Sequence, residues 1–436
     1  MRRALRCLCL TTLLGLSLGG VARAGDQRSL GVGNALAMQQ AESSPLVQSA
    51  RAYILAQVDT VSATQWREAT RDAVANAQTC VAHRVGLTDD DKRAIVEALR
   101  DQGLVDPADD EKILGGLVAG VFPPVVDDGS ACPHVPQSFF SAPGSVFAGH
   151  HSFPGGLAVH VAFNLSSFVS LADNYRRVYG HVGADGLPTV TPAGQPSPTP
   201  AASDLPISED IAVLAPTWHD WGKILVFQWH GDGSEFIELN FGGNGKTDNF
   251  GAAGDSKTGG HHIIGLAETM SRGFPPEFIV TQASAHAAPT YGAEYKVVNW
   301  IRAAALMARV DPVERGYLAR DAAGHLRLAP MRALGTMAMQ DGLPGEPRLL
   351  VEYILHNLSD ADYTFTGPAV TETQALLKQL APRFGYDPAD AAAYNTRFRN
   401  PVMSRFSAER LQILYANDGI EAVALEIGKL KKAGVI

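Results

Sequence analysis

Histidines and aspartates gather in the middle of this 436-residue sequence, where they could form a metal site. The chain has 13 histidines, and most of them lie between His150 and His286. Six candidate ligands fall on or at the ends of predicted helices: His160, His219, Asp220, His261, His286 and Asp311. Imidazole and carboxylate groups are common ligands of divalent metals. The set therefore predicts a metal-binding region.

Helical periodicity directs several of these side chains toward the interior. His160 shares a stripe with Leu157, Val161, Asn164, Leu165 and Phe168. Asp311 extends by one step the stripe formed by Val297, Ile301, Ala304 and Ala308. A single histidine on an apolar face is ordinarily a hydrogen-bonded core residue. Six inward-facing imidazoles and carboxylates need compensation, which divalent cations can provide.

The pair His219-Asp220 has a spacing suited to two metals. Adjacent helical residues project about 100° apart, so the carboxylate can bridge two ions while the imidazole binds one. Lys223 lies three residues after Asp220 on the same face, where it could hold a substrate anion or neutralise the cluster. Two metals so placed can supply a hydroxide at neutral pH and hold the oxygens of a displacement at phosphorus.

The order of these residues resembles the dinuclear form of the HD-domain metal-dependent phosphohydrolase superfamily. Residues 150–160 (HHSFPGGLAVH) are similar to the HHxxxGGLxxH opening of HD-type 3′–5′ exoribonucleases and relaxase-associated domains. Residues 219–223 (HDWGK) match the HDxGK step, and residues 260–265 (GHHIIG) resemble GHxxxG with His261 as the ligand. His286 and Asp311 correspond to the later histidine and the closing aspartate. The resemblance covers about residues 150 to 311.

This resemblance implies an all-α HD-domain helical bundle, with helical N- and C-terminal extensions and Pro/Gly-rich loop insertions. It implies two divalent metal ions, Fe or Mn, with Asp220 as the bridging ligand. Lys223, His150 and His151 would face the substrate. The full ligand set that it implies is His160, His219, Asp220, His261, His286 and Asp311.

Three functions remain open at this point. The resemblance favours hydrolysis of a small phosphomonoester or phosphodiester by a metal-bridging hydroxide, with Asp220 and Lys223 in catalytic roles. A mixed-valent di-iron oxygenase resembling myo-inositol oxygenase has the same ligand order. A binding or structural protein with an idle metal site is the third alternative.

The chain divides into four predicted segments: a signal peptide (1–24), a helical N-terminal region (25–140), a metal-binding core (141–318) and a helical C-terminal extension (319–436). Two arginines, an apolar stretch and Ala22-Arg23-Ala24 predict cleavage after Ala24 and a periplasmic or secreted protein. The remaining cysteines, Cys80 and Cys132, are either a disulfide or two separate thiols. Glu352 and His356, four residues apart, are interpreted as a surface pair.

Charge and hydropathy restrict the partners. The net charge is −9, and the first 24 residues contain four arginines and no acid, so the remainder carries −13. Such a chain repels nucleic acids and anionic lipids, so neither is expected as a partner. No later apolar run approaches about 18 residues, so no membrane span is expected. The expected partner is a small phosphorylated molecule.

Overall fold

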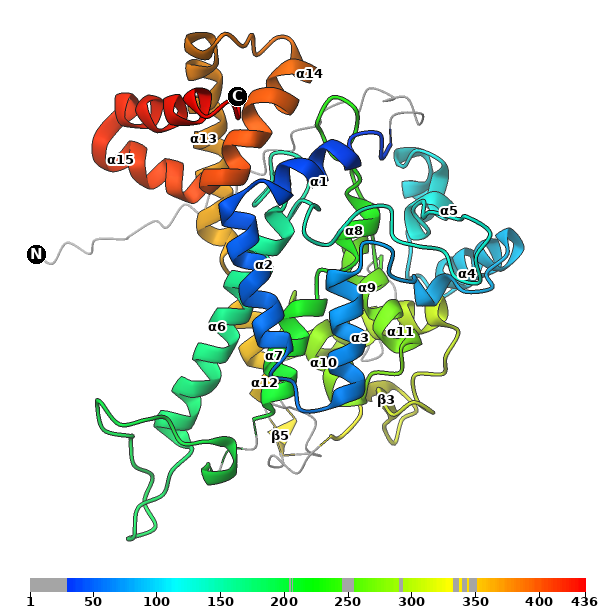
Figure 1. Cartoon of the computed structure of the whole chain (residues 1–436). Helices are drawn as coiled ribbons and strands as arrows, with labels where there is room; N and C mark the ends of the chain where they lie inside the picture. The colour runs from blue at the N-terminus through cyan, green and yellow to red at the C-terminus, as the bar shows by residue number, and fades with distance from the viewer. Residues whose placement is uncertain are drawn as a thin grey trace, which may run out of the picture.

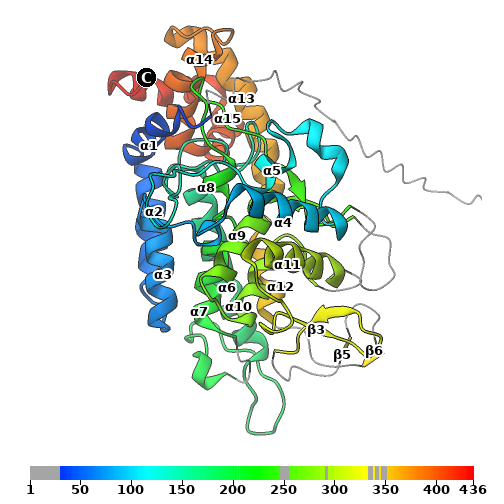
Figure 2. The ribbon, with the colours of Figure 1, turned by 90° about the vertical axis from the view of Figure 1, so that its right-hand side faces the viewer.

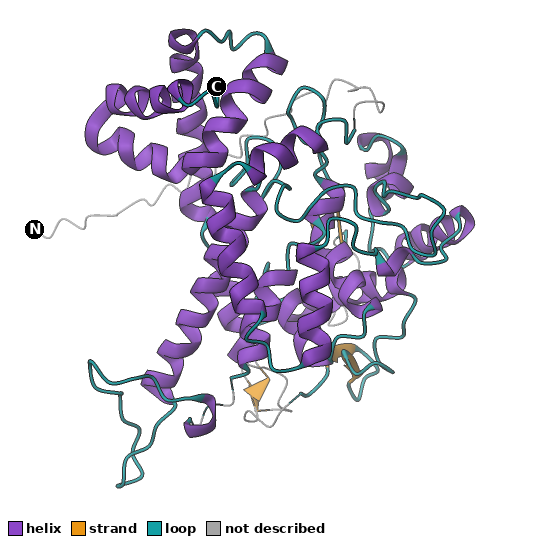
Figure 3. Cartoon of the chain, in the orientation of Figure 1, coloured by secondary structure: helices purple, strands orange, loops and turns teal. Residues whose placement is uncertain are grey.

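The computed structural model describes residues 30–436 apart from 204, 206, 245–254, 290–292, 332–336, 339–342 and 345–350. The predicted signal peptide, residues 1–24, lies outside this part of the chain. The fold is all-α, as the sequence predicted (Figures 1 and 3). Among the described residues, strands occur as three two-stranded antiparallel pairs: β1–β2, β3–β4 and β5–β6.

The elements before the central histidines are α1 (Asn34–Glu42), α2 (Pro45–Val58), α3 (Thr64–Ala75), η2 (Ala82–Arg84), α4 (Asp89–Asp101), η3 (Pro107–Lys112) and α5 (Gly116–Val121). The middle of the chain forms α6 (Gly156–Tyr179), η4 (Pro200–Ala202), α7 (Glu209–Trp218), α8 (Lys223–Val226), β1 (Asn240–Phe241), β2 (Thr258–Gly259), α9 (Gly260–Ser271), α10 (Pro276–Ala283) and α11 (Glu294–Ala308). The remainder forms β3 (Leu318–Arg320), β4 (Leu326–Leu328), β5 (Met337–Ala338), β6 (Leu343–Pro344), α12 (Val351–Ser359), α13 (Tyr363–Phe384), α14 (Ala391–Tyr394), η5 (Asn395–Arg399) and α15 (Asn400–Lys432).

Local sequence explains where several helices begin. Thr88 and Asp91 form a capping box at α4, in which each side chain accepts the other residue's backbone N–H. Ser44 and Ser208 cap α2 and α7 by accepting the N–H three residues later. These caps satisfy donors that the first helical turn leaves unpaired.

Helix α6 is the long central helix, and it packs against α2, α7 and α12. With 24 residues, α6 is long enough and apolar enough to cross a membrane, judged by length and composition alone. Half of the most apolar window is buried inside the protein, however, and the predicted stripe around His160 is buried with it. We therefore interpret α6 as a core helix. Figure 1 shows its far end leading into the loop that connects it to α7.

Apolar side chains form two cores. The larger core extends from α1 to α12 and includes Trp218 and Trp221. The second core joins α13, η5 and α15 with Phe153, which precedes α6. Figure 2 shows these C-terminal helices together at one end of the molecule. Helix α15 changes direction at Ser407 and Gly419, where the backbone leaves helical geometry.

The N-terminal region is tied to the central helices through Glu268 of α9. Its carboxylate accepts the backbone N–H groups of Ala82 and His83, lies 2.7 Å from His83 Nδ1 and pairs with Arg272. Burial would raise the pKa of Glu268, but the hydrogen bond from His83 and the charge of Arg272 outweigh it and lower that pKa from 4.5 to about 2. A disulfide between Cys80 and Cys132 closes the same region.

Replacing Glu268 with glutamine should destabilise the fold by about 3 kcal/mol at neutral pH, because a buried ion pair loses one partner. The folded-state pKa lies below the usual value, so the carboxylate stabilises the fold above about pH 4.5, and this contribution is lost as pH falls toward 2. Chemical denaturation across this range should show the difference between wild type and E268Q shrinking with acidity. The control E421Q alters an exposed pair and should cost less than about 1 kcal/mol. A wild-type advantage that stays constant down to pH 2 would contradict this role.

Candidate metal centre

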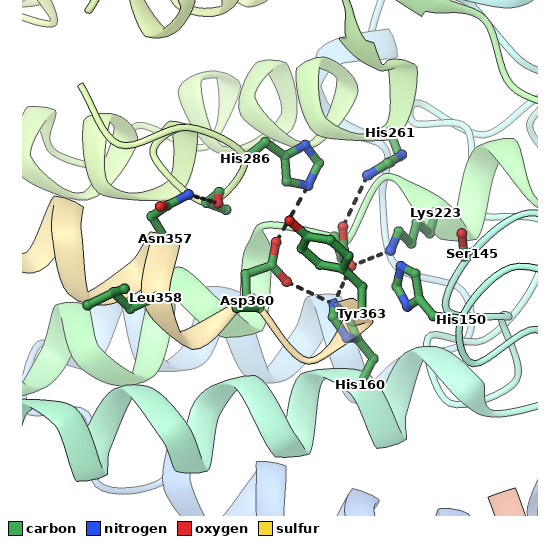
Figure 4. Close-up of a pocket in the computed structure, with 13 residues that line it drawn as sticks. Ser145, His150, His160, Lys223, His261, His286, Asn357, Leu358, Asp360 and Tyr363 are labelled. Carbon is green, nitrogen blue, oxygen red and sulfur yellow. Dashed lines mark hydrogen bonds and ion pairs between the residues drawn. The ribbon is translucent and has the colours of Figure 1, made fainter. Parts of the chain in front are cut away.

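A cavity of about 380 Å³ lies where α6, α9 and the turns after α7, α10 and α12 meet. Six predicted residues line it directly: His150, His160, Asp220, Lys223, His261 and His286. Figure 4 shows the histidines and Lys223 directed toward the middle of this cavity, with Asp360 among them.

Asp220 lies between histidines on both sides. Its Oδ2 atom is 3.0 Å from His160 Nε2 and 3.2 Å from His219 Nε2. Its Oδ1 atom is 3.2 Å from His261 Nε2. The two oxygens of one carboxylate thus face two separate groups of imidazoles, as a bridging ligand requires.

Asp360, directly after α12, provides a second carboxylate. Its Oδ1 atom is 3.1 Å from His160 Nε2 and 3.3 Å from His219 Nε2, while Oδ2 is 3.8 Å from His286 Nε2. His160, His219 and Asp220 can hold one metal ion, and Asp220, His261 and His286 can hold another. Asp360 adds an oxygen next to the first of these groups.

In each of the four histidines, the Nδ1 atom contacts a partner on the side of the ring away from the centre. The partners are Asp362 for His160 (3.2 Å), the Pro216 carbonyl for His219 (2.9 Å), Glu238 for His261 (2.7 Å) and the Thr258 hydroxyl for His286 (2.9 Å). Such partners fix the ring orientation of metal-binding histidines. All four rings therefore present Nε2 to the centre.

The donor atoms are arranged as metal ligands would be. Asp220 Oδ1 and His261 Nε2 are buried and only 3.2 Å apart, yet neither has a hydrogen-bond partner. Two ligands bonded at about 2.1 Å and at right angles to each other lie about 3 Å apart. The separations around Asp220 match this value. The residues present therefore fit divalent metal ions.

The buried carboxylates of the centre favour the binding of positively charged groups. Burial would raise the pKa of Asp220, but His219 and Lys223 outweigh it and hold that pKa well below its usual range. Burial lowers the pKa of His219, but Asp220 and Asp360 raise it to about 9. Protons on imidazoles such as that of His219 thus balance the buried carboxylates when metal is absent, whereas burial lowers the pKa of His286 to about 4. Metal ions would displace these protons.

The turn that carries His219 and Asp220 depends on a glycine. The sequence predicts one helix over 208–227, but α7 ends at Trp218 and α8 begins at Lys223. A Cβ atom on Gly222 would lie 2.1 Å from the carbonyl oxygen of His261. The backbones that carry Asp220 and His261 can therefore approach only because residue 222 has no side chain.

Asp311 does not belong to the centre, so this predicted ligand is wrong. Helix α11 ends at Ala308, and Arg309 adopts a left-handed conformation. Asp311 lies beyond that helix end on the surface, where its carboxylate accepts the N–H groups of Glu314 and Val313, which lower its pKa. Extrapolating the helical stripe failed because the helix had already ended.

The remaining predicted residues occupy different positions. Lys223 lines the cavity, and its ammonium donates to Asp220 Oδ2 at 2.5 Å and to the Gly144 carbonyl. His150 lines the cavity, whereas His151 lines a neighbouring groove. Glu352 and His356 are buried, so the surface-pair interpretation is wrong.

Sequence reasoning missed Asp360, Glu238 and Asp362. Asp360 follows His356 by one helical turn on a buried face, and that periodicity was a usable signal. Glu238 lies in the glycine-rich insertion before α9, where no local pattern indicates its partner. The centre also crosses the predicted boundary at residue 318, because Asp360 comes from the C-terminal extension.

Comparison of the chain with protein-family models, curated proteins and solved structures found no match. The fold and the site together define an all-α protein with buried histidine and aspartate clusters that can bind metal ions.

Substitutions of Asp360 and of Asp311 should affect the metal content differently. Asp360→Asn should lose about one divalent ion per chain, because losing a direct ligand weakens affinity more than the 10–100-fold typical of supporting residues. Asp311→Asn should keep the wild-type content. Elemental analysis of the reconstituted, desalted proteins measures both. Metal loss in the Asp311 variant alone would contradict the assignment.

A methyl group at residue 222 should disturb the centre without removing a ligand side chain. Gly222→Ala should cost about 1–3 kcal/mol of folding free energy and reduce metal content, because α9 must move away. The matched control is Gly265→Ala in α9, whose added Cβ would make ordinary contacts at 3.5 Å or more. Thermal unfolding measures the stability of the two variants, and elemental analysis measures their metal content. Equal behaviour of the two variants would show that the close approach is unimportant.

Proposed function

We propose that this chain is an HD-type metal-dependent phosphohydrolase acting on a small phosphomonoester or phosphodiester. The main support is Asp220, whose two oxygens face separate histidine groups in the order that the sequence motifs suggest. Asp360 supplies the closing aspartate in place of Asp311. The proposed pair of divalent ions is Fe or Mn.

The charge balance of the cavity supports an anionic substrate. Asp220, Asp360, Glu238 and Asp362 lie in or directly behind the centre, and Lys223 is the cation bonded to it. These groups leave three negative charges, which two divalent ions convert to one positive charge. Bound metals of this kind provide a water of lowered pKa and polarise phosphoryl oxygens.

The cavity size favours a small substrate. Its volume of about 380 Å³ is near the lower end of typical ligand pockets. Asn357 and the exposed Tyr363 line it together with His150, so a ligand would meet both polar and aromatic groups. Lys223 holds Asp220 and contributes positive charge beside the cavity. The acidic chain makes a polynucleotide substrate unfavourable.

We also propose that the protein is exported. Ala22-Arg23-Ala24 supports a cleaved signal peptide. The Cys80–Cys132 disulfide supports an oxidising compartment such as the periplasm or the cell exterior.

Hydrolysis of p-nitrophenyl phosphate and bis(p-nitrophenyl) phosphate by the Mn²⁺- or Fe²⁺-loaded protein tests this proposal. Nitrophenol release should depend on metal and should fall more than about 100-fold in Asp220→Asn, because that variant loses the shared ligand. Asp311→Asn is the matched control and should retain activity.

Oxygen uptake should be recorded in parallel with polyol and phosphonate substrates. Oxygen consumption without phosphoester cleavage would overturn the hydrolase proposal in favour of the oxygenase. A fully metal-loaded protein that catalyses neither reaction on a broad set of small phosphoesters would favour an idle metal site.

A further inference from the structure

A second group of potential ligands lies behind His160, on the side away from the cavity. It consists of His151 before α6, Asp362 before α13 and Glu409 in α15. His151 Nε2 is 3.8 Å from Asp362 Oδ2 and 3.5 Å from Glu409 Oε1. The three side chains come from elements far apart in the sequence, and both carboxylates lie near the His151 imidazole.

These groups face one another without ordinary hydrogen bonds. Both distances exceed the 2.7–3.2 Å of a good N–H···O bond. The side chains of His151, Asp362 and Glu409 are 4%, 7% and 20% exposed, and Glu409 Oε1 is buried with no hydrogen-bond partner. Buried carboxylates left in this state are costly unless a cation compensates them.

The separations match those of ligands around one metal ion. Ligands bonded at about 2.1 Å with angles of about 110–130° lie about 3.4–3.8 Å apart. The Nδ1 atom of His151 is 3.3 Å from Nδ1 of His150, so the Nε2 atom is the one directed at the carboxylates. This arrangement repeats the pattern of the metal centre, where each imidazole is held through Nδ1.

The backbone conformation around His151 constrains the direction of its side chain. His151 has φ of 51°, in the left-handed region that non-glycine residues rarely adopt. Its carbonyl accepts the N–H of Gly144, and a Cβ on Gly156 would lie 1.8 Å from that carbonyl. Tight packing of this loop therefore fixes where the imidazole points.

We propose that His151, Asp362 and Glu409 form a third divalent cation site, separate from the two ions of the metal centre. One imidazole and two carboxylates suit Mn²⁺, Fe²⁺ or Zn²⁺. The three residues line a groove of about 880 Å³ beside α6, which gives an ion a route that bypasses the cavity of the metal centre.

The third ion would connect the C-terminal helices to the metal centre. Glu409 lies in α15, which belongs to the second apolar core, while Asp362 also holds His160 through its Nδ1 atom. Binding at this site would therefore fix the carboxylate that orients a metal-centre ligand. Neither Glu409 nor His151 contacts Asp220 or Asp360 at ion-pair distance among the described contacts.

Manganese content after reconstitution and desalting tests the proposal with four proteins. Wild type should hold about three ions per chain, Glu409→Gln two, Asp220→Asn one, and the double variant none. Glu421→Gln, which changes another glutamate of α15 that is exposed, is the matched control and should hold three. The two ions retained by Glu409→Gln also show that this variant is folded.

The outcomes separate this site from the metal centre. A wild-type content of two that is unchanged by Glu409→Gln and lost in Asp220→Asn overturns the third site and keeps the metal centre. A wild-type content of one ion that is lost in Glu409→Gln and kept in Asp220→Asn overturns the metal centre and keeps the third site. A wild-type protein that binds no manganese, iron or zinc overturns both.

Discussion

The structure depends on the burial of the Asp220 carboxylate among the imidazoles of His160, His219 and His261. A carboxylate in this position needs positive charge on both of its sides, and the fold places two histidines near one oxygen and one near the other. Asp360 adds a second buried negative charge. Protonated imidazoles can balance these charges, but each ring is also oriented with Nε2 inward by a partner behind it. That combination is expected when the groups are selected to hold metal ions.

The helices and the turns between them bring the histidines next to Asp220. Central α6 brings His160 into the larger core, while α7 and α8 break apart so that His219 and Asp220 occupy a turn. Gly222 lets that turn approach the start of α9, which carries His261. The C-terminal helices have their own apolar core and still contribute to the centre, because Asp360 and Asp362 lie between α12 and α13. The metal centre is therefore a junction between parts of the chain that are distant in sequence.

Much of the fold class and most of the centre could be predicted from local patterns. Apolar stripes report burial within one helix, and this was enough to orient His160 correctly. Helix ends are less predictable, and Asp311 was assigned to the centre because the stripe was extended past the end of α11. Contacts such as Glu238 with His261 join an irregular insertion to a helix, so no periodicity encodes them. Glu352 and His356 were misjudged because spacing alone does not reveal which helix faces are covered by other helices.

If Asp220 joins two metal ions, anomalous X-ray diffraction of crystals grown with Mn²⁺ should locate both of them. One manganese peak should lie beside Asp220 Oδ2, His160, His219 and Asp360, and another beside Asp220 Oδ1, His261 and His286. Peaks on both sides of the carboxylate would establish it as the bridging ligand. A manganese-saturated crystal with no peak near Asp220, or with ions bound only at Asp311, would show that Asp220 does not bridge metal ions.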